Sequence, residues 1–264
     1  MSKTYNINTG SSGIIDKSLL SVMPCGHKPN SQFYWKSTLM YEIVRTINDA
    51  DIAAFLCVVK AYTDNKFDAL SKGTGQTFHL ADVVEHNEED KDLAVSVFSV
   101  YVSEVSRLAY NRRASSKMLL ESLERISSLN IHLLDDKLRS RGFIKLINAA
   151  VLSDDKKTVR VSINRQVLKS LAANKLQYNF DKMLQLKGLA KRLYLVMQNR
   201  KYKAGKGKYR YTNIDDAELR LAMNHNNKDT KKIFERLFKE IGIKFVLGRN
   251  GKWFYPEKRL NVFA

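Results

Sequence analysis

The chain has 264 residues, of which 44% are hydrophobic, so we expect one large folded domain or two smaller ones. A formal net charge of +18 is hard to explain by solubility alone and indicates a polyanionic partner such as DNA or RNA. No apolar run approaches the roughly 20 residues that span a bilayer, and two cysteines give no disulfide framework, so we expect a cytoplasmic protein.

The positive charge is concentrated in one half of the chain. Residues 1–136 contain 14 Lys/Arg and 17 Asp/Glu, whereas residues 137–264 contain 31 and 10. No strongly amphipathic basic helix with an aromatic face is present, which argues against a membrane surface as the partner. The charge of this basic half therefore favours nucleic acid as the partner.

The first half begins with a segment, residues 1–37, that is rich in Gly, Ser and Asn and is expected to be a flexible arm. After it, capping residues, apolar periodicity and β-branched alternation predict a series of elements. In chain order these are an extended segment at 39–46, a helix from Asn48 or Asp49, a solvated acidic loop at 85–92, a strand at 93–102, helices at 103–110 and 114–128, a strand at 130–134, a basic loop at 135–142, and strands at 143–151 and 158–164.

The second half repeats much of this order. We predict a helix at 186–199, a short strand at 209–212, a short helix at 213–223 with Asn213 as N-cap, and a helix at 229–241 ended by Gly242. Two strands at 243–247 and 252–256 follow, and the Asn250-Gly251 pair between them is a strong hairpin signal.

Helix, strand, helix, turn, helix and hairpin is the order of a winged helix, in which the second helix of the turn enters the DNA groove and the hairpin is the wing. Two copies predict an α+β chain of two tandem winged-helix domains, mostly helical with small hairpin wings. We expect them at residues 38–175 and 176–264, after the arm at 1–37.

Helical spacing separates the expected reading faces from the core. On the second recognition helix, Arg236 suits a guanine edge and Glu235 suits cytosine N4, although Glu235 can instead pair with Lys231 or Lys239. On the first recognition helix, Met118 can touch a thymine methyl or lie in the core.

The stretch "RKYKAGKGKYRY", residues 200–211, has six basic residues, three tyrosines and no acid. It is either a loop that contacts phosphates, followed by a strand that pairs with the wing, or a solvated loop. The predicted DNA-contacting residues are Arg112, Arg113, Lys117, Arg125, Arg139, Arg141, Lys201, Lys203, Lys206, Lys208, Lys228, Lys232, Glu235, Arg236, Lys239, Arg249 and Lys252.

Signals for catalysis are weak. The sequence contains no phosphate-binding G-x-x-x-x-G-K-[ST] loop, no H-x-H pair near a tyrosine and no paired carboxylates typical of a two-metal nuclease. Cys25 and His27 lack a partner pair at zinc-finger spacing. We therefore expect no enzymatic activity, no metal and no cofactor.

The run "TVRVSINRQVLKSLAANKLQYNFDKMLQLKGLAKRLYLVMQ", residues 158–198, resembles the junction between the two winged helices of bacterial plasmid replication initiators. The similarity extends over about residues 93–260. The matching motif positions are Asn164, Val167, Leu168, Leu186, Lys187, Ala190, Arg192, Leu193 and Tyr194.

The resemblance implies a protein that binds directly repeated double-stranded origin sites, called iterons, helps to open the adjacent AT-rich duplex and recruits the host helicase. It also implies a host initiator as partner, a homodimer through the N-terminal winged helix and a part in plasmid copy control. A winged-helix transcriptional or partition regulator that binds an operator is the main alternative; a nuclease or relaxase and an RNA-binding protein are two others.

Overall fold

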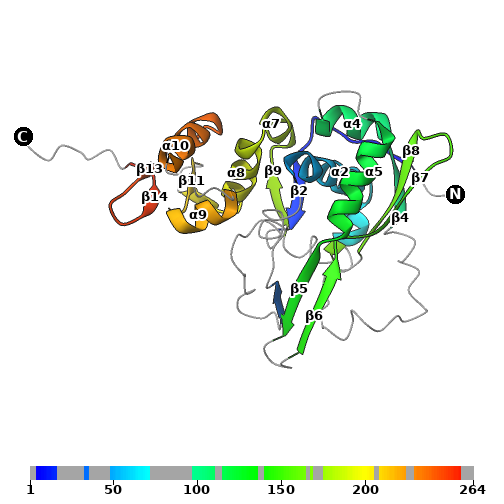
Figure 1. Cartoon of the computed structure of the whole chain (residues 1–264), viewed down its shortest axis with the longest axis horizontal. Coiled ribbons are helices and arrows are strands. Elements are labelled where there is room, and N and C mark those ends of the chain that lie inside the picture. Colours follow the sequence, from blue (N-terminus) through cyan, green and yellow to red (C-terminus); the bar gives the residue numbers. More distant parts are fainter. Residues whose placement is uncertain are drawn as a thin grey trace, which may run out of the picture.

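The structure is a computed structural model and describes residues 4–16, 33–35, 48–71, 97–110, 115–135, 140–164, 167–168, 175–204, 208–223 and 229–256. The predicted extended segment at 39–46 and the acidic loop at 85–92 lie outside these ranges. The elements form two lobes, with the pair of strands β2 (Gly13–Asp16) and β9 (Lys175–Tyr178) between them (Figure 1).

Helix α2 (Asp49–Ser71) is the centre of the first lobe. Its start is fixed by a reciprocal cap, because Asn48 Oδ1 accepts from the Asp51 amide at 2.9 Å and Asp51 Oδ2 accepts from the Asn48 amide at 3.1 Å. Every residue from 51 to 63 is buried, as expected for a helix that is apolar on nearly all sides. The helix predicted to begin at Asn48 or Asp49 is confirmed.

Helices α4 (Val102–Tyr110) and α5 (Ser116–Ser127) pack on α2 and follow strand β4 (Val97–Tyr101). Strands β7 (Ile147–Leu152) and β8 (Thr158–Ile163) form the hairpin of a sheet ordered β1-β4-β8-β7, in which β1 is Thr4–Tyr5. The strand that precedes the two helices thus pairs with the last strand of the hairpin.

Two strands of an additional three-stranded sheet, β5 (Asn130–Asp135) and β6 (Ser140–Lys145), lie between α5 and this hairpin in the chain, although α5 packs directly on β7. This sheet is ordered β3-β5-β6, with β3 at Phe33–Trp35. The prediction of one strand at 143–151 is wrong, because Leu146, which is fully buried, separates two strands that belong to different sheets. The predicted basic loop at 135–142 is also wrong where its ends pair as strands.

The second lobe contains α8 (Leu189–Gln198), α9 (Asp216–Met223) and α10 (Thr230–Glu240). Its sheet is ordered β12-β14-β13, with β12 at Ile214–Asp215, β13 at Val246–Leu247 and β14 at Lys252–Phe254. Here too, the strand before the paired helices bonds to the last strand of the hairpin. Each lobe therefore contains a strand, two helices and a hairpin in this order, with β5 and β6 inserted in the first lobe, and in both the strand bonds to the last strand of the hairpin. The fold is mixed α+β.

Residues 200–211 differ from the prediction. Strands β10 (Lys201–Ala204) and β11 (Lys208–Tyr211) pair with each other, so 209–212 is not the strand that pairs with the second hairpin. That strand is β12, because Ile214 buries its side chain opposite Trp253. Asn213 is consequently not the N-cap of the next helix, which begins at Asp216.

The expectation of a flexible arm is wrong for residues 4–16. Strand β1 pairs in parallel with β4, and β2 pairs with β9. The buried Lys60 ammonium fixes the segment between them, since it donates to Ser11 Oγ at 2.5 Å, to the Ser12 carbonyl at 3.2 Å and to Asp64 Oδ1 at 2.8 Å. The N-terminal segment is therefore part of the core.

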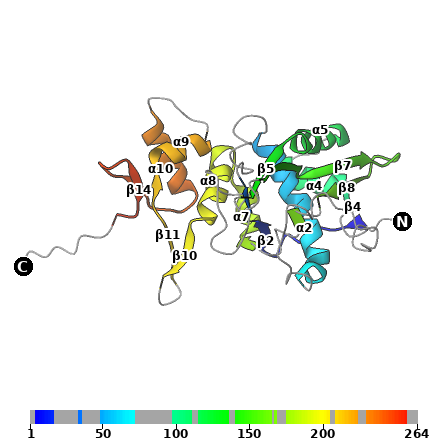
Figure 2. The ribbon, with the colours of Figure 1, turned by 90° about the horizontal axis from the view of Figure 1, so that it is seen from below.

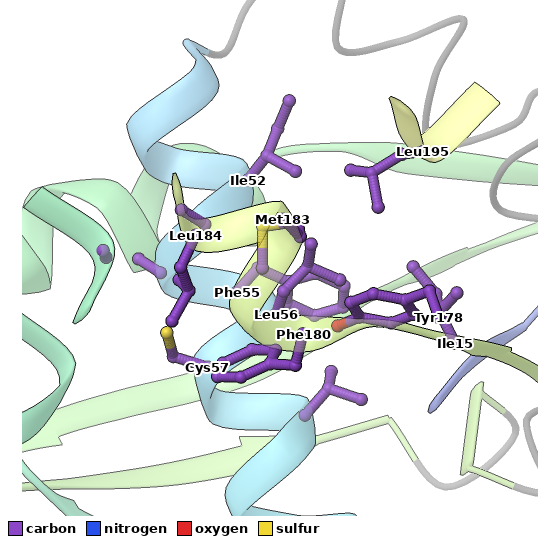
Figure 3. Packing of buried hydrophobic residues seen from close by; sticks show 14 of the residues in the cluster. Ile15, Ile52, Phe55, Leu56, Cys57, Tyr178, Phe180, Met183, Leu184 and Leu195 are labelled. Atoms are coloured by element: carbon purple, nitrogen blue, oxygen red, sulfur yellow. The ribbon is translucent and has the colours of Figure 1, made fainter. Parts of the chain in front are cut away.

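The lobes share one hydrophobic core. Short helix α7 (Phe180–Gln185) packs its Phe180 and Met183 against α2, and Ile15 and Tyr178 lie beside them (Figure 3). The predicted boundary at 175/176 falls inside β9, the strand that bonds to the N-terminal segment. No helix within the described ranges is long and apolar enough to cross a bilayer.

Candidate nucleic-acid interface

Helix α10 presents a broad charged face to solvent. Phe234, Leu237 and Phe238 are buried, and the Phe238 ring lies 5.3 Å from that of Trp253 in β14. The exposed residues of the opposite face are Lys231, Lys232, Glu235, Arg236, Lys239 and Glu240. Buried rings hold this helix on the lobe, which leaves its long polar side chains available to a ligand.

Glu235 had two alternative roles, as a base contact or as an ion-pair partner. Within this helix the structure contains no ion pair between Glu235 and Lys231 or Lys239. Glu235 and Arg236 are both exposed, so the charged face of α10 offers a hydrogen-bond acceptor as well as a bidentate donor.

The β13–β14 hairpin places two more cations at the same end of the lobe. Arg249 and Lys252 are exposed, and Lys252 Nζ lies 3.7 Å from Asp215 Oδ1. Gly251 has a φ of 72°, which glycine adopts without strain and which allows the tight turn between the strands.

The β10–β11 hairpin projects from the body of the second lobe (Figure 2). Lys201, Tyr202 and Arg210 are exposed, and Tyr202 lies opposite Arg210 in the strand register. Arg200 fixes the base of the hairpin, since it donates to the Asn213 carbonyl at 2.5 Å and pairs with Glu218 of α9. Alternation of basic and aromatic residues in 201–204 and 208–211 was the signal that could have predicted two strands and the contribution of Arg210.

Burial of Tyr211 completes the anchoring of this hairpin. Its ring centroid is 6.3 Å from that of Tyr255, which follows β14, and burial raises the pKa of both phenols. The base of the hairpin therefore packs on the segment that follows β14.

The first lobe offers fewer cations on its corresponding helix. Ser115 caps α5 by accepting from the Met118 amide at 3.2 Å, and Leu119, Leu123 and Ile126 are buried. Lys117 is exposed and lies 3.9 Å from Glu121, and Met118 is half-buried.

Arg125 has a structural partner that the sequence did not reveal. Its guanidinium donates to both carboxylate oxygens of Asp51, at 2.8 and 2.9 Å, and the Asp51 side chain is 1% exposed. This hydrogen bonding to Asp51 raises the pKa of Arg125. Arg125 was predicted to contact DNA; its guanidinium is bound to a buried carboxylate, and a DNA contact by it stays a prediction.

Several predicted contact residues lie beyond what the structure describes. Arg112, Arg113, Arg139, Lys206 and Lys228 are outside the described ranges. Arg141, Lys203 and Lys208 are placed by their backbone in β6, β10 and β11. Of the predicted set, the structure brings together Lys232, Glu235, Arg236 and Lys239 on α10, with Arg249 and Lys252 on the adjacent hairpin.

The described residues contain no group of three or more His, Cys, Asp and Glu side chains suited to a metal ion. Cys25 and His27 lie outside the described ranges, so the expectation of no metal stays a prediction.

Cys57 is buried in α2, and burial raises the pKa of its thiol to about 12.

Comparison with known proteins informs on the fold. No family model and no curated protein matches the chain. Among solved structures, that of the Pi initiator protein in complex with iteron DNA matches with a TM-score of 0.53 and 13% identity, over 95% of this chain and 100% of that chain. The chain shares the fold of the Pi initiator protein. The resemblance to plasmid replication initiators is thereby confirmed as a likeness of fold over nearly the whole length.

Proposed function

We propose that this protein is a plasmid replication initiator that binds directly repeated sites in duplex DNA at an origin. The observation that carries the proposal is the shared fold with an initiator whose structure holds iteron DNA. The match covers nearly all of both chains, which supports a shared two-lobe fold, because a single helix-turn-helix would match only a part of either chain.

The proposal assigns a winged helix to each lobe, with α5 and α10 as recognition helices and the β7–β8 and β13–β14 hairpins as wings. It is supported by the repeated strand pairing, in which β4 bonds to β8 and β12 bonds to β14. In this geometry the exposed face of α10 lies in the major groove, and the cations of the β13–β14 hairpin contact the adjacent backbone.

The charges suggest that the lobes contribute unequally. The basic excess of the second half favours phosphate contacts there, whereas the first half has a small acidic excess. We propose that the second lobe supplies most of the electrostatic affinity. The first lobe then makes further contacts that fix the position of the protein along the DNA.

In this role the protein acts in the cytoplasm without a catalytic step, and it opens the neighbouring duplex and recruits the host initiator and helicase. A homodimer formed through the first lobe and a part in copy control belong to the same proposal. Purified protein is accordingly expected to bind origin DNA without hydrolysing ATP.

Footprinting on the DNA that flanks the coding region tests the proposal. The expected result is protection of several direct repeats in tandem, beside an AT-rich tract. Protection of one palindromic operator would instead identify a regulator of the same fold, and preferential binding to single-stranded RNA would overturn the proposal.

A further inference from the structure

One aspartate of the second lobe, Asp216, links helix α9 to the β13–β14 hairpin. Asp216, at the start of α9, accepts from Trp253 Nε1 of β14 at 2.8 Å through Oδ1, and from Arg220 Nε at 2.6 Å through Oδ2. Its backbone amide donates to the Gly251 carbonyl, in the turn of the β13–β14 hairpin, at 2.9 Å. Asp216 is thus bound to the hairpin through both its side chain and its backbone.

The chain of bonds continues to α10. Arg220 Nη1 donates to Thr230 Oγ1 at 3.1 Å, and Thr230, the first residue of α10, is fully buried. A continuous set of charge-assisted hydrogen bonds therefore runs from Trp253 through Asp216 and Arg220 to the N-terminus of α10. Such bonds are stronger and more directional than neutral ones.

The neighbouring apolar packing does not fix this geometry alone. Trp253 is fully buried against Phe234 and Phe238 of α10, with ring centroids 6.0 and 5.3 Å away. Ring packing tolerates small rotations, whereas a bidentate carboxylate bonded to an indole and a guanidinium at once does not.

We propose that Asp216 is a positioning residue for DNA recognition, which sets the angle between α10 and the β13–β14 hairpin without itself touching DNA. This inference rests on the proposed function, because it assumes that α10 reads base edges. A base contact needs its donors aligned with one groove edge, so a small tilt of α10 should weaken sequence reading more than it weakens phosphate contacts.

The negative charge of Asp216 allows a positioning role to be distinguished from a purely electrostatic one. Replacing Asp216 by a neutral residue removes a negative charge from a basic lobe, so electrostatics alone would tighten binding to every DNA. A positioning role predicts that the specific site binds more weakly while random DNA binds as well as before or slightly better.

The test measures the affinity ratio between a duplex that the wild-type protein selects from a random library and a scrambled duplex of equal length. Asp216→Asn should lower this ratio roughly 10-fold, the size of one misaligned bidentate base contact. Trp253→Phe keeps an aromatic ring but removes the indole donor, and it should lower the ratio in the same direction. Asp215→Asn is the matched control for charge, because Asp215 is adjacent and 57% exposed, and its carboxylate forms a 3.7 Å ion pair with Lys252. Releasing Lys252, a proposed phosphate contact, should strengthen binding to both duplexes alike, so the ratio should stay near that of wild type.

The indole N–H resonance of Trp253 provides a direct second measurement, and it should shift in Asp216→Asn and stay in place in Asp215→Asn. If Asp216→Asn shifts the resonance but leaves the ratio unchanged, the bond is structural only and the inference is overturned. Equal strengthening of binding to both duplexes would also overturn it. If the wild-type protein selects no sequence at all, the proposed function fails instead.

Discussion

Asp49, in the first turn of α2, forms an ion pair with Arg192 of α8, 143 residues further along the chain. Asp49 Oδ1 accepts from Arg192 Nη2 at 3.0 Å and from Nε at 3.1 Å. The Arg192 side chain is 8% exposed and that of Asp49 is 23% exposed. The pair therefore joins the two lobes at the margin of their shared core, where little water competes.

We predict that Arg192→Ala lowers the free energy of unfolding by about 3 kcal/mol, because it leaves the Asp49 carboxylate partly buried without its partner. Denaturant unfolding checks the value. Lys187→Ala, an exposed residue just before α8, should change stability by less than about 0.5 kcal/mol. If the double variant Asp49→Asn/Arg192→Ala loses the sum of the two single effects, the pair contributes nothing of its own.

Arg125→Ala is predicted to act on stability rather than on DNA binding. Its guanidinium neutralises the buried Asp51 carboxylate, so its loss should cost about 3 kcal/mol. The folded fraction should keep its ratio of specific to random DNA affinity. Lys117→Ala is the control on the same helix, since its side chain is 84% exposed. A variant with normal stability and a lower affinity ratio would return Arg125 to the set of base-reading residues.

The sequence was most informative where local chemistry decides the structure. The helix at 114–128, which the structure has at Ser116–Ser127, and the Asn250-Gly251 turn could be predicted, because each depends on residues close in the chain. The resemblance carried by residues 158–198 predicted the fold that the Pi initiator comparison confirms.

The remaining features depend on contacts that are distant in sequence. Residues 4–16 look like a polar arm, and they are ordered by pairing with strands 95 and about 160 residues away. Arg125 looks like any exposed helix cation, and only the fold brings Asp51 to it. The base-reading role of α10 follows from the proposed function and stays a prediction.

Gly13→Ala should destabilise the N-terminal strand. A Cβ at this position would lie 2.3 Å from Cζ of Tyr178, which is buried in β9, so the ring or the strand must move. We expect a loss of about 2 kcal/mol, typical of an overpacked core site. Gly10→Ala is the matched control, because its nearest neighbour would be Asn8 Oδ1 at 3.5 Å. Equal stability of the two variants by thermal unfolding would contradict the docking of β2 on β9.

Cys57 should react with thiol reagents only when the protein unfolds. Burial raises its pKa to about 12, above the value of about 8.5 for a free thiol, so the reactive thiolate is scarce near neutral pH. The stabilising contribution of the protonated thiol is complete below about pH 8.5 and is lost as the pH rises through the folded-state pKa. In a Cys25→Ser background, alkylation at pH 7.5 should follow the unfolded fraction across a denaturant series. Fast labelling without denaturant would show that this part of α2 opens readily.

Residues that read bases and residues that bind phosphates should respond differently to substitution. Arg236→Ala should lower affinity for the selected duplex by about 1–3 kcal/mol and leave random DNA little changed beyond one charge. Replacing Lys201, Lys203 and Lys206 together by alanine should weaken binding to both DNAs alike.

The most direct test is a salt titration of both variants on both duplexes. If all three lysines contact phosphates, the triple variant should flatten the slope of log K against log salt concentration by about 2.7, with an unchanged specificity ratio. Arg236→Ala should lower that ratio with a much smaller change of slope. Equal weakening of both DNAs by Arg236→Ala would place α10 on the backbone and contradict sequence reading by this helix.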